Sequence, residues 1–197
     1  MSIMAQLDLF TQPDQRPAER WALTRPMAAS RLKQHAIARL DFVRRHFPEL
    51  DAVTVKVGRT TSRRAHAWAS LDPAMPAIWI KPGALPLFTV THELTHLLQA
   101  RGLAPRGEKA ADLYALARHP ELIDKPPTYL RVPRILFGFK GNPRPGTAML
   151  LCRTARRAIA EAPTKPRRAV RLFEEYAALA AVPSALRIYD MFGPMLA

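Results

Sequence analysis

The chain has 197 residues, of which 30 are Lys or Arg and 16 are Asp or Glu, so its formal charge at pH 7 is +14. This length fits one compact domain, or one domain with a small appendage, and excludes a large multidomain enzyme. Cys152 is the only cysteine. An internal disulfide framework and a cysteine-based zinc finger are therefore excluded, and any metal must be held by His and carboxylate side chains.

The sequence contains neither of the two common membrane-targeting features. No run approaches the roughly 18 apolar residues that a spanning helix needs, and the first ten residues lack the pattern of a secretory signal. Together with the single cysteine, this predicts a cytoplasmic protein. The excess positive charge favours a polyanionic partner, either nucleic acid or an anionic membrane surface, and does not by itself choose between them.

Residues 1–20 are predicted to form a flexible leader, because residues 11–19 are rich in Gln, Pro and Asp. The leader contains the sequence Gln6-Leu-Asp-Leu-Phe10, which resembles the peptide by which bacterial DNA polymerases and repair factors dock on the replication sliding clamp. Its apolar residues are costly to leave in water, and a hydrophobic pocket on a partner would bury them. The resemblance implies that the clamp is bound by Gln6, Leu7, Asp8, Leu9 and Phe10. The alternative is that these residues fold back onto the protein's own core.

We expect an ordered catalytic domain over residues 21–130. Apolar residues at roughly helical spacing predict a first helix over residues 26–47, which Pro48 ends. Residues 53–57 and 65–69 alternate as strands do, and residues 77–80 form a short apolar run before a Lys-Pro-Gly turn. Three strands in an antiparallel meander are expected, followed by two helices, so the predicted fold class is α+β.

The first of these two helices, over about residues 87–100, contains His92-Glu93-Leu94-Thr95-His96. Four residues make about one helical turn, so the two imidazoles project from one face and can converge on a single Zn²⁺, while Glu93 can reach a metal-bound water. Two histidines leave the metal without enough ligands. A third ligand is therefore required.

The second helix, over about residues 107–118, supplies the candidate. Glu108 and Asp112 are spaced i and i+4, and a helical hairpin would return their shared face to the histidine pair. Glu108 would complete a His₂Glu site with one open position, and Asp112 could accept a hydrogen bond from the second ring nitrogen of a zinc-bound histidine.

The combination of H-E-x-x-H with a downstream E-x-x-A-D helix resembles the small gluzincin-type zinc metallopeptidases, among them HtpX-like and ImmA/IrrE-like proteins. The resemblance covers about residues 53–118. It implies a zincin-like fold, one Zn²⁺ on His92, His96 and Glu108, Glu93 as general base, and Asp112 behind a ligand. The absence of transmembrane helices makes the membrane-embedded members poor models for substrate. Two alternatives remain, a solvated helix that carries two histidines and a zincin-like domain that binds zinc structurally or has lost turnover.

Peptide hydrolysis in such a site would use a strand at the edge of the cleft to pair with the substrate backbone, and we place that strand at residues 65–70 or 77–80. The candidates for a donor to the tetrahedral oxyanion are His119, Tyr129 and Tyr114. We expect His35, His46 and His66 to be ordinary surface or packing residues.

Residues 131–197 are expected to form a basic helical C-terminal region packed on the catalytic domain. Residues 131–171 hold eleven basic residues against Glu161 alone. Helices are predicted over residues 148–162 and 166–181, and their arginines suit sequence-independent contact with a nucleic acid backbone. The candidate residues are Arg153, Arg156 and Arg157, which share a helix face, and Arg167, Arg168 and Arg171. The alternative is a solvated surface that only confers solubility.

The apolar residues of the terminal helices are predicted to face the core, so no membrane partner is expected. These residues are Leu172, Phe173, Tyr176, Leu179, Val182, Leu186, Ile188 and Met191.

The sequence as a whole predicts a zinc metalloprotease recruited to DNA by the sliding clamp and acting on DNA-associated proteins. The alternatives are an ImmA-like protease that cleaves a specific repressor and a non-enzymatic DNA- or clamp-binding protein with a structural zinc site.

Overall fold

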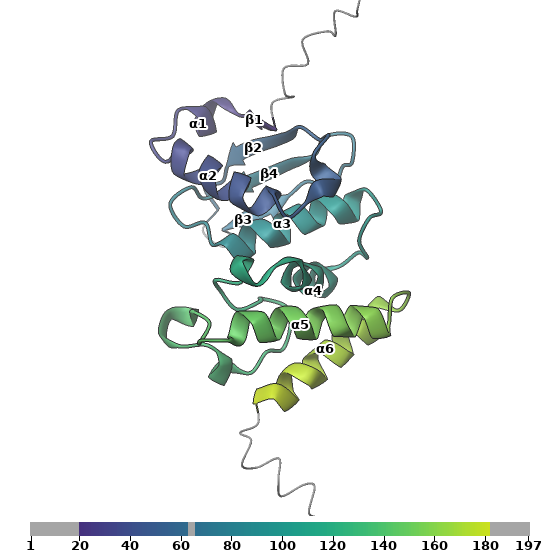
Figure 1. The fold of residues 1–197 in the computed structure, drawn as a ribbon. Helices are drawn as coiled ribbons and strands as arrows, with labels where there is room; N and C mark the ends of the chain where they lie inside the picture. Colours follow the sequence, from purple (N-terminus) through teal and green to yellow (C-terminus); the bar gives the residue numbers. More distant parts are fainter. Residues whose placement is uncertain (1–19, 63–65, 182–197) are drawn as a thin grey trace, which may run out of the picture.

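The computed structural model describes residues 20–62 and 66–181. This part of the chain is mixed α+β, with six α-helices and one four-stranded sheet, which confirms the predicted fold class. The clamp-like motif at residues 6–10 lies outside the described residues, as do Val182, Leu186, Ile188 and Met191. Figure 1 shows the elements following one another along one direction, from the sheet and its helices to the last two helices.

The elements have the following bounds. The strands are β1 (Trp21–Leu23), β2 (Val55–Arg59), β3 (Ala67–Ala69) and β4 (Ala77–Ile80). The α-helices are α1 (Arg25–Ala28), α2 (Lys33–Arg44), α3 (Leu87–Ala100), α4 (Glu108–Arg118), α5 (Thr147–Glu161) and α6 (Pro166–Ala181). Short 3₁₀ helices are η1 (Pro48–Leu50), η2 (Pro120–Leu122), η3 (Arg134–Leu136) and η4 (Phe139–Gly141).

The sheet has the order β1-β2-β4-β3, and the prediction of a three-stranded antiparallel meander is wrong. β1 pairs parallel with β2, β2 pairs parallel with β4, and only the β3–β4 pair is antiparallel. Parallel neighbours need a long crossover, which α1 and α2 supply between β1 and β2. Alternation along one strand shows which of its faces is buried, but it does not show which strands pair with it. The strand β1 was not predicted because its three residues are too few to show an alternating pattern.

The first predicted helix is also divided, into the short α1 and the longer α2. The Ser30 hydroxyl accepts a hydrogen bond from the Leu32 backbone N–H at 3.3 Å. A serine side chain that bonds nearby backbone in this way competes with the helical hydrogen-bond ladder. The break therefore has a local cause that apolar spacing does not reveal.

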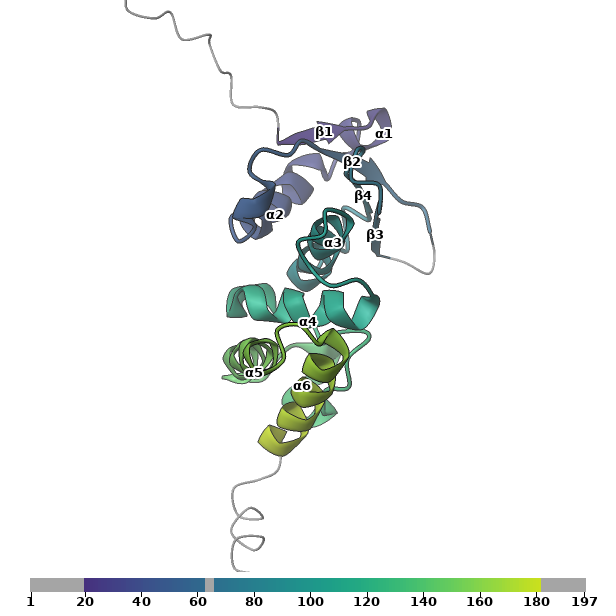
Figure 2. The same cartoon turned by 90° about the vertical axis from the view of Figure 1, so that its right-hand side faces the viewer.

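The described residues form two apolar cores, one that includes residues of α3 and one that includes residues of α4. In the first, α2 and α3 cover one face of the sheet, and Leu40, Leu94 and Ile78 represent the three elements that meet there. In the second, α4 packs with α5 and α6, represented by Leu116, Leu151 and Phe173. Figure 2 shows this arrangement from the side, with α3 between the sheet and α4, and α5 and α6 on the far side of α4. The C-terminal helices therefore share a core with the second helix of the predicted site.

Leu179 does not face this core, as its side chain is exposed. It lies near the end of α6. Among the described residues, no helix combines the length and apolar character that crossing a bilayer requires.

Candidate metal centre

The helix α3 carries the first motif and is buried on nearly every side. Eleven of its fourteen residues are buried, although polar residues make up much of its sequence. Thr91 and Thr95 satisfy their hydroxyls by donating to the carbonyls of Leu87 and Thr91, each at 2.8 Å. A helix that is buried on all sides normally carries apolar residues. The other buried polar side chains of α3 are therefore unexpected unless they have a specific role. They are His92, Glu93, His96 and Gln99.

Three of the predicted ligands meet at one point. His92 Nε2 lies 3.0 Å from His96 Nε2, and these two nitrogens lie 3.1 and 3.2 Å from Glu108 Oε2. Tetrahedral ligands about 2.05 Å from Zn²⁺ are separated by roughly 3.3 Å. The triangle of donor atoms therefore has the size that a zinc ion requires.

The hydrogen-bond partner of Nδ1 in each ring shows which ring nitrogen carries the proton. His92 Nδ1 lies 2.8 Å from Asp112 Oδ1, and His96 Nδ1 lies 2.8 Å from Gln99 Oε1. Both oxygens are acceptors, so each neutral ring donates from Nδ1 and keeps a lone pair on Nε2. The Gln99 amide is oriented independently, because its Nε2 donates to the carbonyls of Pro105 and Gly107.

While both rings are neutral, two imidazole lone pairs and a carboxylate oxygen face one another at hydrogen-bond distance. Such an arrangement is repulsive unless positive charge occupies its centre. Burial lowers the pKa of His92, but the hydrogen bond and charge of Asp112 and the charges of Glu93 and Glu108 outweigh it and raise the pKa, so either a ring proton or a metal ion can supply the positive charge at the centre. The donor set fits a divalent ion that accepts nitrogen and oxygen ligands, as zinc does. Gln99 was not predicted from the sequence, although its position three residues after His96 places it on the same helix face.

The loop between α3 and α4 brings Glu108 to the histidines. Gly102 and Gly107 adopt φ values of 72° and 109°, which side chains with a Cβ rarely adopt. Gly102 turns the chain at the end of α3, and Gly107 directly precedes the first residue of α4. These two glycines allow a short loop to return Glu108 to the face from which His92 and His96 project.

Asp112 lies one turn along α4 and is 1% exposed. Its two oxygens accept from different partners, Oδ1 from His92 and Oδ2 from the Tyr129 backbone N–H at 2.6 Å. A buried carboxylate that orients a metal-binding imidazole raises the basicity of that ligand. Asp112 also ties the segment around Tyr129 to the centre.

Glu93 is buried beside the ligands, at 6% exposure. Burial is the largest influence on its pKa, which is raised to about 7. The positive charge of protonated His92 and a hydrogen bond from the Ala69 backbone lower the pKa, while Glu108 and Asp112 raise it. A carboxyl group with a pKa near neutrality can both take up and release a proton.

A cleft of about 800 Å³ opens beside Glu93 and His92. Its lining includes Ala67 of β3 and residues 124–126, 128 and 129. The Tyr129 ring stacks against His92 with ring centroids 5.7 Å apart. His35 and His66 are exposed, as expected, and also line this cleft.

Of the three candidates for an oxyanion donor, only Tyr129 is in this cleft. Tyr114 packs between the two apolar cores. His119 follows the last residue of α4, and a helix rises about 1.5 Å per residue, so it is roughly 16 Å from Glu108 at the other end. The structure therefore places Tyr114 and His119 where they cannot serve this centre.

The six candidate arginines are all exposed. Arg156 donates to the carbonyls of Ala117 and Arg118 at the end of α4, whereas Arg157 pairs with Glu161 and lies over the Tyr176 ring. Neighbouring arginines of α5 thus point to different helices. Arg153 stays exposed on α5, and Arg167, Arg168 and Arg171 lie near the start of α6.

No family profile matches this chain, and neither a curated protein nor a solved structure matches it. The resemblance to gluzincins therefore depends on the two motifs and their spacing.

Proposed function

We propose that this protein is a zinc-dependent metallopeptidase with a zincin-like catalytic domain that hydrolyses peptide bonds. One observation carries the proposal, the convergence of two imidazole lone pairs and a carboxylate oxygen beside a buried glutamate at a cleft. His92 Nε2, His96 Nε2 and Glu108 Oε2 would hold the ion. A zinc ion in such a site supplies Lewis acidity and lowers the pKa of water to about 7.

Glu93 has the protonation behaviour that a general base and acid requires. Burial raises its pKa to about 7 in the metal-free protein, and a carboxylate held beside the ion could take a proton from water and later give that proton to the leaving amine. A structural role does not explain why a carboxylate is buried in this helix, because burial raises the free energy of its charged form. This argues against a purely structural zinc site.

The edge of the sheet offers a place for an extended substrate. β4 lies between β2 and β3, so of the two strands considered only β3 is an edge strand in the described part of the sheet. Ser70 N–H donates to Ala77 and Lys81 N–H donates to His66, so the intervening groups of Ala67 and Ala69 point away from β4. The Ala69 N–H is the group that bonds Glu93. Ala67 would therefore pair with the substrate backbone.

Tyr129 is the remaining candidate for a donor to the oxyanion. Burial is the largest cause of its raised pKa, followed by the charges of Glu108, Asp112 and Glu93. The phenol therefore keeps its proton at neutral pH and can donate it in a hydrogen bond.

The test compares wild-type protein, loaded with zinc, with the Glu93→Gln variant in a peptide-cleavage assay and in a metal assay. We expect one zinc ion at this centre in both proteins and cleavage only by the wild type. Glu175→Gln, an equivalent change at an exposed position of α6, is the matched control and should cleave normally. Equal cleavage by the Glu93→Gln variant and the wild type would reject the role assigned to Glu93. If all the proteins bind zinc but none of them, including the wild type, cleaves the peptide, the zinc site is structural.

We further propose recruitment to DNA, through the sliding clamp and through direct contact with the phosphate backbone, so that the substrates are DNA-associated proteins. The clamp-like motif at residues 6–10 and the charge of +14 support this. Arg106, Lys109, Arg167 and Arg171 line a groove of about 500 Å³ where α4 and α6 begin, and Glu108 lies in its wall. Two helix N-termini with basic side chains suit phosphate groups.

Two binding assays test recruitment separately from catalysis. The double variant Leu9→Ala/Phe10→Ala should lose clamp binding and keep its zinc and its cleavage rate, and unchanged clamp affinity would reject the motif. For DNA, the Arg167→Ala/Arg171→Ala variant should bind more weakly and show a shallower dependence of log affinity on log salt, by about two units. An unchanged slope would show that these two arginines do not contact the phosphate backbone and are only solvated surface residues.

A further inference from the structure

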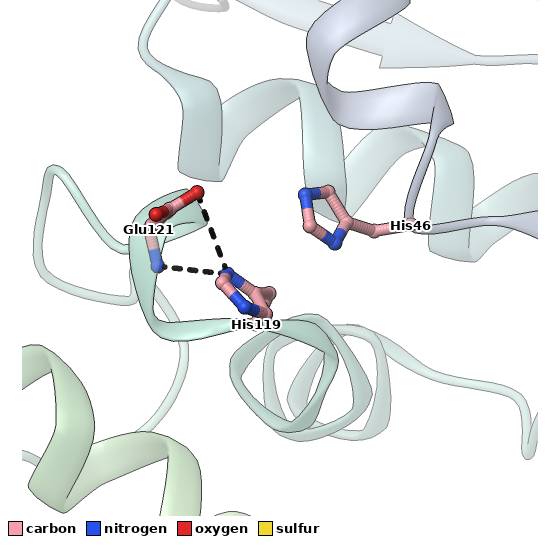
Figure 3. Close-up of side chains that lie close together, drawn as sticks. All are labelled: His46, His119 and Glu121. Atoms are coloured by element: carbon pink, nitrogen blue, oxygen red, sulfur yellow. Dashed lines mark hydrogen bonds and ion pairs between the residues drawn. The ribbon is translucent and has the colours of Figure 1, made fainter.

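We propose a second metal site, formed by His46, His119 and Glu121, in which a zinc-like divalent cation joins the end of α2 to the end of α4. One nitrogen from each ring and one carboxylate oxygen all lie within 4.8 Å of one another. Figure 3 shows the three side chains directed at a common space, with His46 approaching from the segment after α2 and the other two from the turn after α4. The site is independent of the candidate catalytic centre, because it lies at the opposite end of α4 from Glu108.

The backbone around the cluster is held by Arg118, the last residue of α4. Its guanidinium pairs with Glu49 at 2.8 Å, lies 4.4 Å from the centre of the Phe47 ring, and donates to the His46 carbonyl. These contacts fix residues 46–49 against the end of α4. Because Phe47 is fully buried, the position of the neighbouring His46 depends on the core and not on its own surface contacts.

The two imidazoles are packed face to face, with centroids 4.6 Å apart and an angle of 27° between the ring planes. Two protonated rings would repel each other at this distance, so the arrangement disfavours the doubly charged pair. The lone pairs of the two rings lie in nearly parallel planes, so one ring must turn for both nitrogens to bind a single ion. The pKa of His46 is lowered first by burial and second by His119.

Glu121 completes the donor set at the start of η2. Its carboxylate lies 3.8 Å from His119 Nδ1, and its backbone N–H donates to the same nitrogen at 3.4 Å. Ligands on a zinc ion at about 2.1 Å can be separated by up to roughly 4.2 Å, whereas the donor atoms of the cluster lie within 4.8 Å of one another, so binding requires the Glu121 carboxylate to move closer and one imidazole to turn. The Glu121 side chain, which is 65% exposed, is free enough to make its movement.

The ligand chemistry indicates the class of ion. Two imidazoles and one carboxylate prefer Zn²⁺ and its neighbours in the first transition row to Mg²⁺ or Ca²⁺, which take oxygen ligands. The site is looser and more exposed than the triangle on α3, so its affinity is lower. Its expected role is structural, because the ion would connect a segment packed in the first apolar core to the end of a helix packed in the second.

The test measures Zn²⁺ bound by the full chain after removal of metal with a chelator. Wild type should bind two ions, the His119→Ala variant one, and the His92→Ala/His96→Ala variant one. His35→Ala is the matched control, because its ring lies outside both clusters, and it should bind two. Glu121→Gln should weaken binding of the second ion by about tenfold or more. A wild type that binds a single ion, lost entirely in the His92→Ala/His96→Ala variant, would overturn the proposal and leave the catalytic centre intact.

Thermal unfolding gives a second measurement that does not depend on activity. In the His92→Ala/His96→Ala background, added Zn²⁺ should raise the unfolding temperature in a concentration-dependent manner, because an ion that binds only the folded state stabilises it. Adding His119→Ala to this background should abolish the rise. An equal rise in the presence of His119→Ala would overturn the proposal, and a wild type whose only zinc is lost through His119→Ala would instead overturn the catalytic centre.

Discussion

The Nδ1 of His92 donates to Oδ1 of Asp112 at 2.8 Å, across the interface between α3 and α4. Because Asp112 is almost fully buried, this hydrogen bond determines both the ring orientation and the tautomer of His92. The second oxygen of the same carboxylate holds the Tyr129 backbone. One buried side chain therefore connects a candidate ligand, the helix that carries Glu108, and one wall of the cleft.

Replacing Asp112 with Ala should weaken zinc binding at the α3 centre by about 10–100-fold. The change removes the acceptor that keeps the lone pair of His92 on Nε2, and it removes the hydrogen-bond partner of the Tyr129 backbone N–H. Competition with a chromophoric chelator measures the affinity. Asp72→Asn, at an exposed turn before β4, is the control and should bind as the wild type does. Wild-type affinity in Asp112→Ala would show that the carboxylate does not orient the ligand.

Replacing Gln99 separates two roles of that side chain. Gln99→Glu keeps an acceptor for His96 Nδ1 but loses the donation to the Pro105 and Gly107 carbonyls, whereas Gln99→Leu loses both. We expect both variants to unfold at a lower temperature, since the loop before Glu108 is no longer tied, and Gln99→Leu to show the larger loss of zinc affinity. Equal zinc affinity in the two variants would contradict the assigned role in orienting His96.

A proline at position 67 tests the edge of β3. Ala67 directs its N–H away from β4, so Ala67→Pro removes a donor to the substrate without breaking the sheet ladder. The expected result is a KM for peptide substrates raised by about tenfold, the loss of roughly one hydrogen bond, with zinc content unchanged. Ala67→Ser keeps the N–H and is the control. A proline variant with the KM of the serine variant would exclude backbone pairing at this strand.

The outer face of the sheet depends on a close approach between β2 and the Trp79 ring. A Cβ atom built on Gly58 would lie 2.4 Å from Trp79 Cδ1, and Trp68 stacks on Trp79 with centroids 3.8 Å apart. Gly58→Ala should therefore lower the free energy of unfolding by about 1–3 kcal/mol and alter tryptophan fluorescence. Gly83→Ala, where the nearest atom is a Leu32 methyl at 3.1 Å, is the control and should cost less. Equal stability of the two variants would contradict the packing described.

Several features of this protein could be predicted because they depend on neighbours in the sequence. The helix expected over residues 87–100 matches α3, and the helix expected over 166–181 matches α6, since the apolar spacing, Gly102 and Pro166 are local signals. The spacing of His92 and His96 likewise follows from helix geometry. The predicted strand order was wrong because strands that are distant in the sequence pair with one another, and the local sequence of one strand does not indicate its partner.

Sequence alone determined that any metal site must use histidine and carboxylate, that two histidines share one turn of a helix, and that the positive charge lies mainly behind this helix. Tertiary structure decided which side chains surround them. Packing of α3 on α4 places Asp112 behind His92, the return of the loop places Gln99 behind His96, and the meeting of α2 with the end of α4 brings His46 to His119. A helix sets distances over a few residues through its own hydrogen bonds, whereas contacts between distant segments depend on how the cores pack, which no local pattern records.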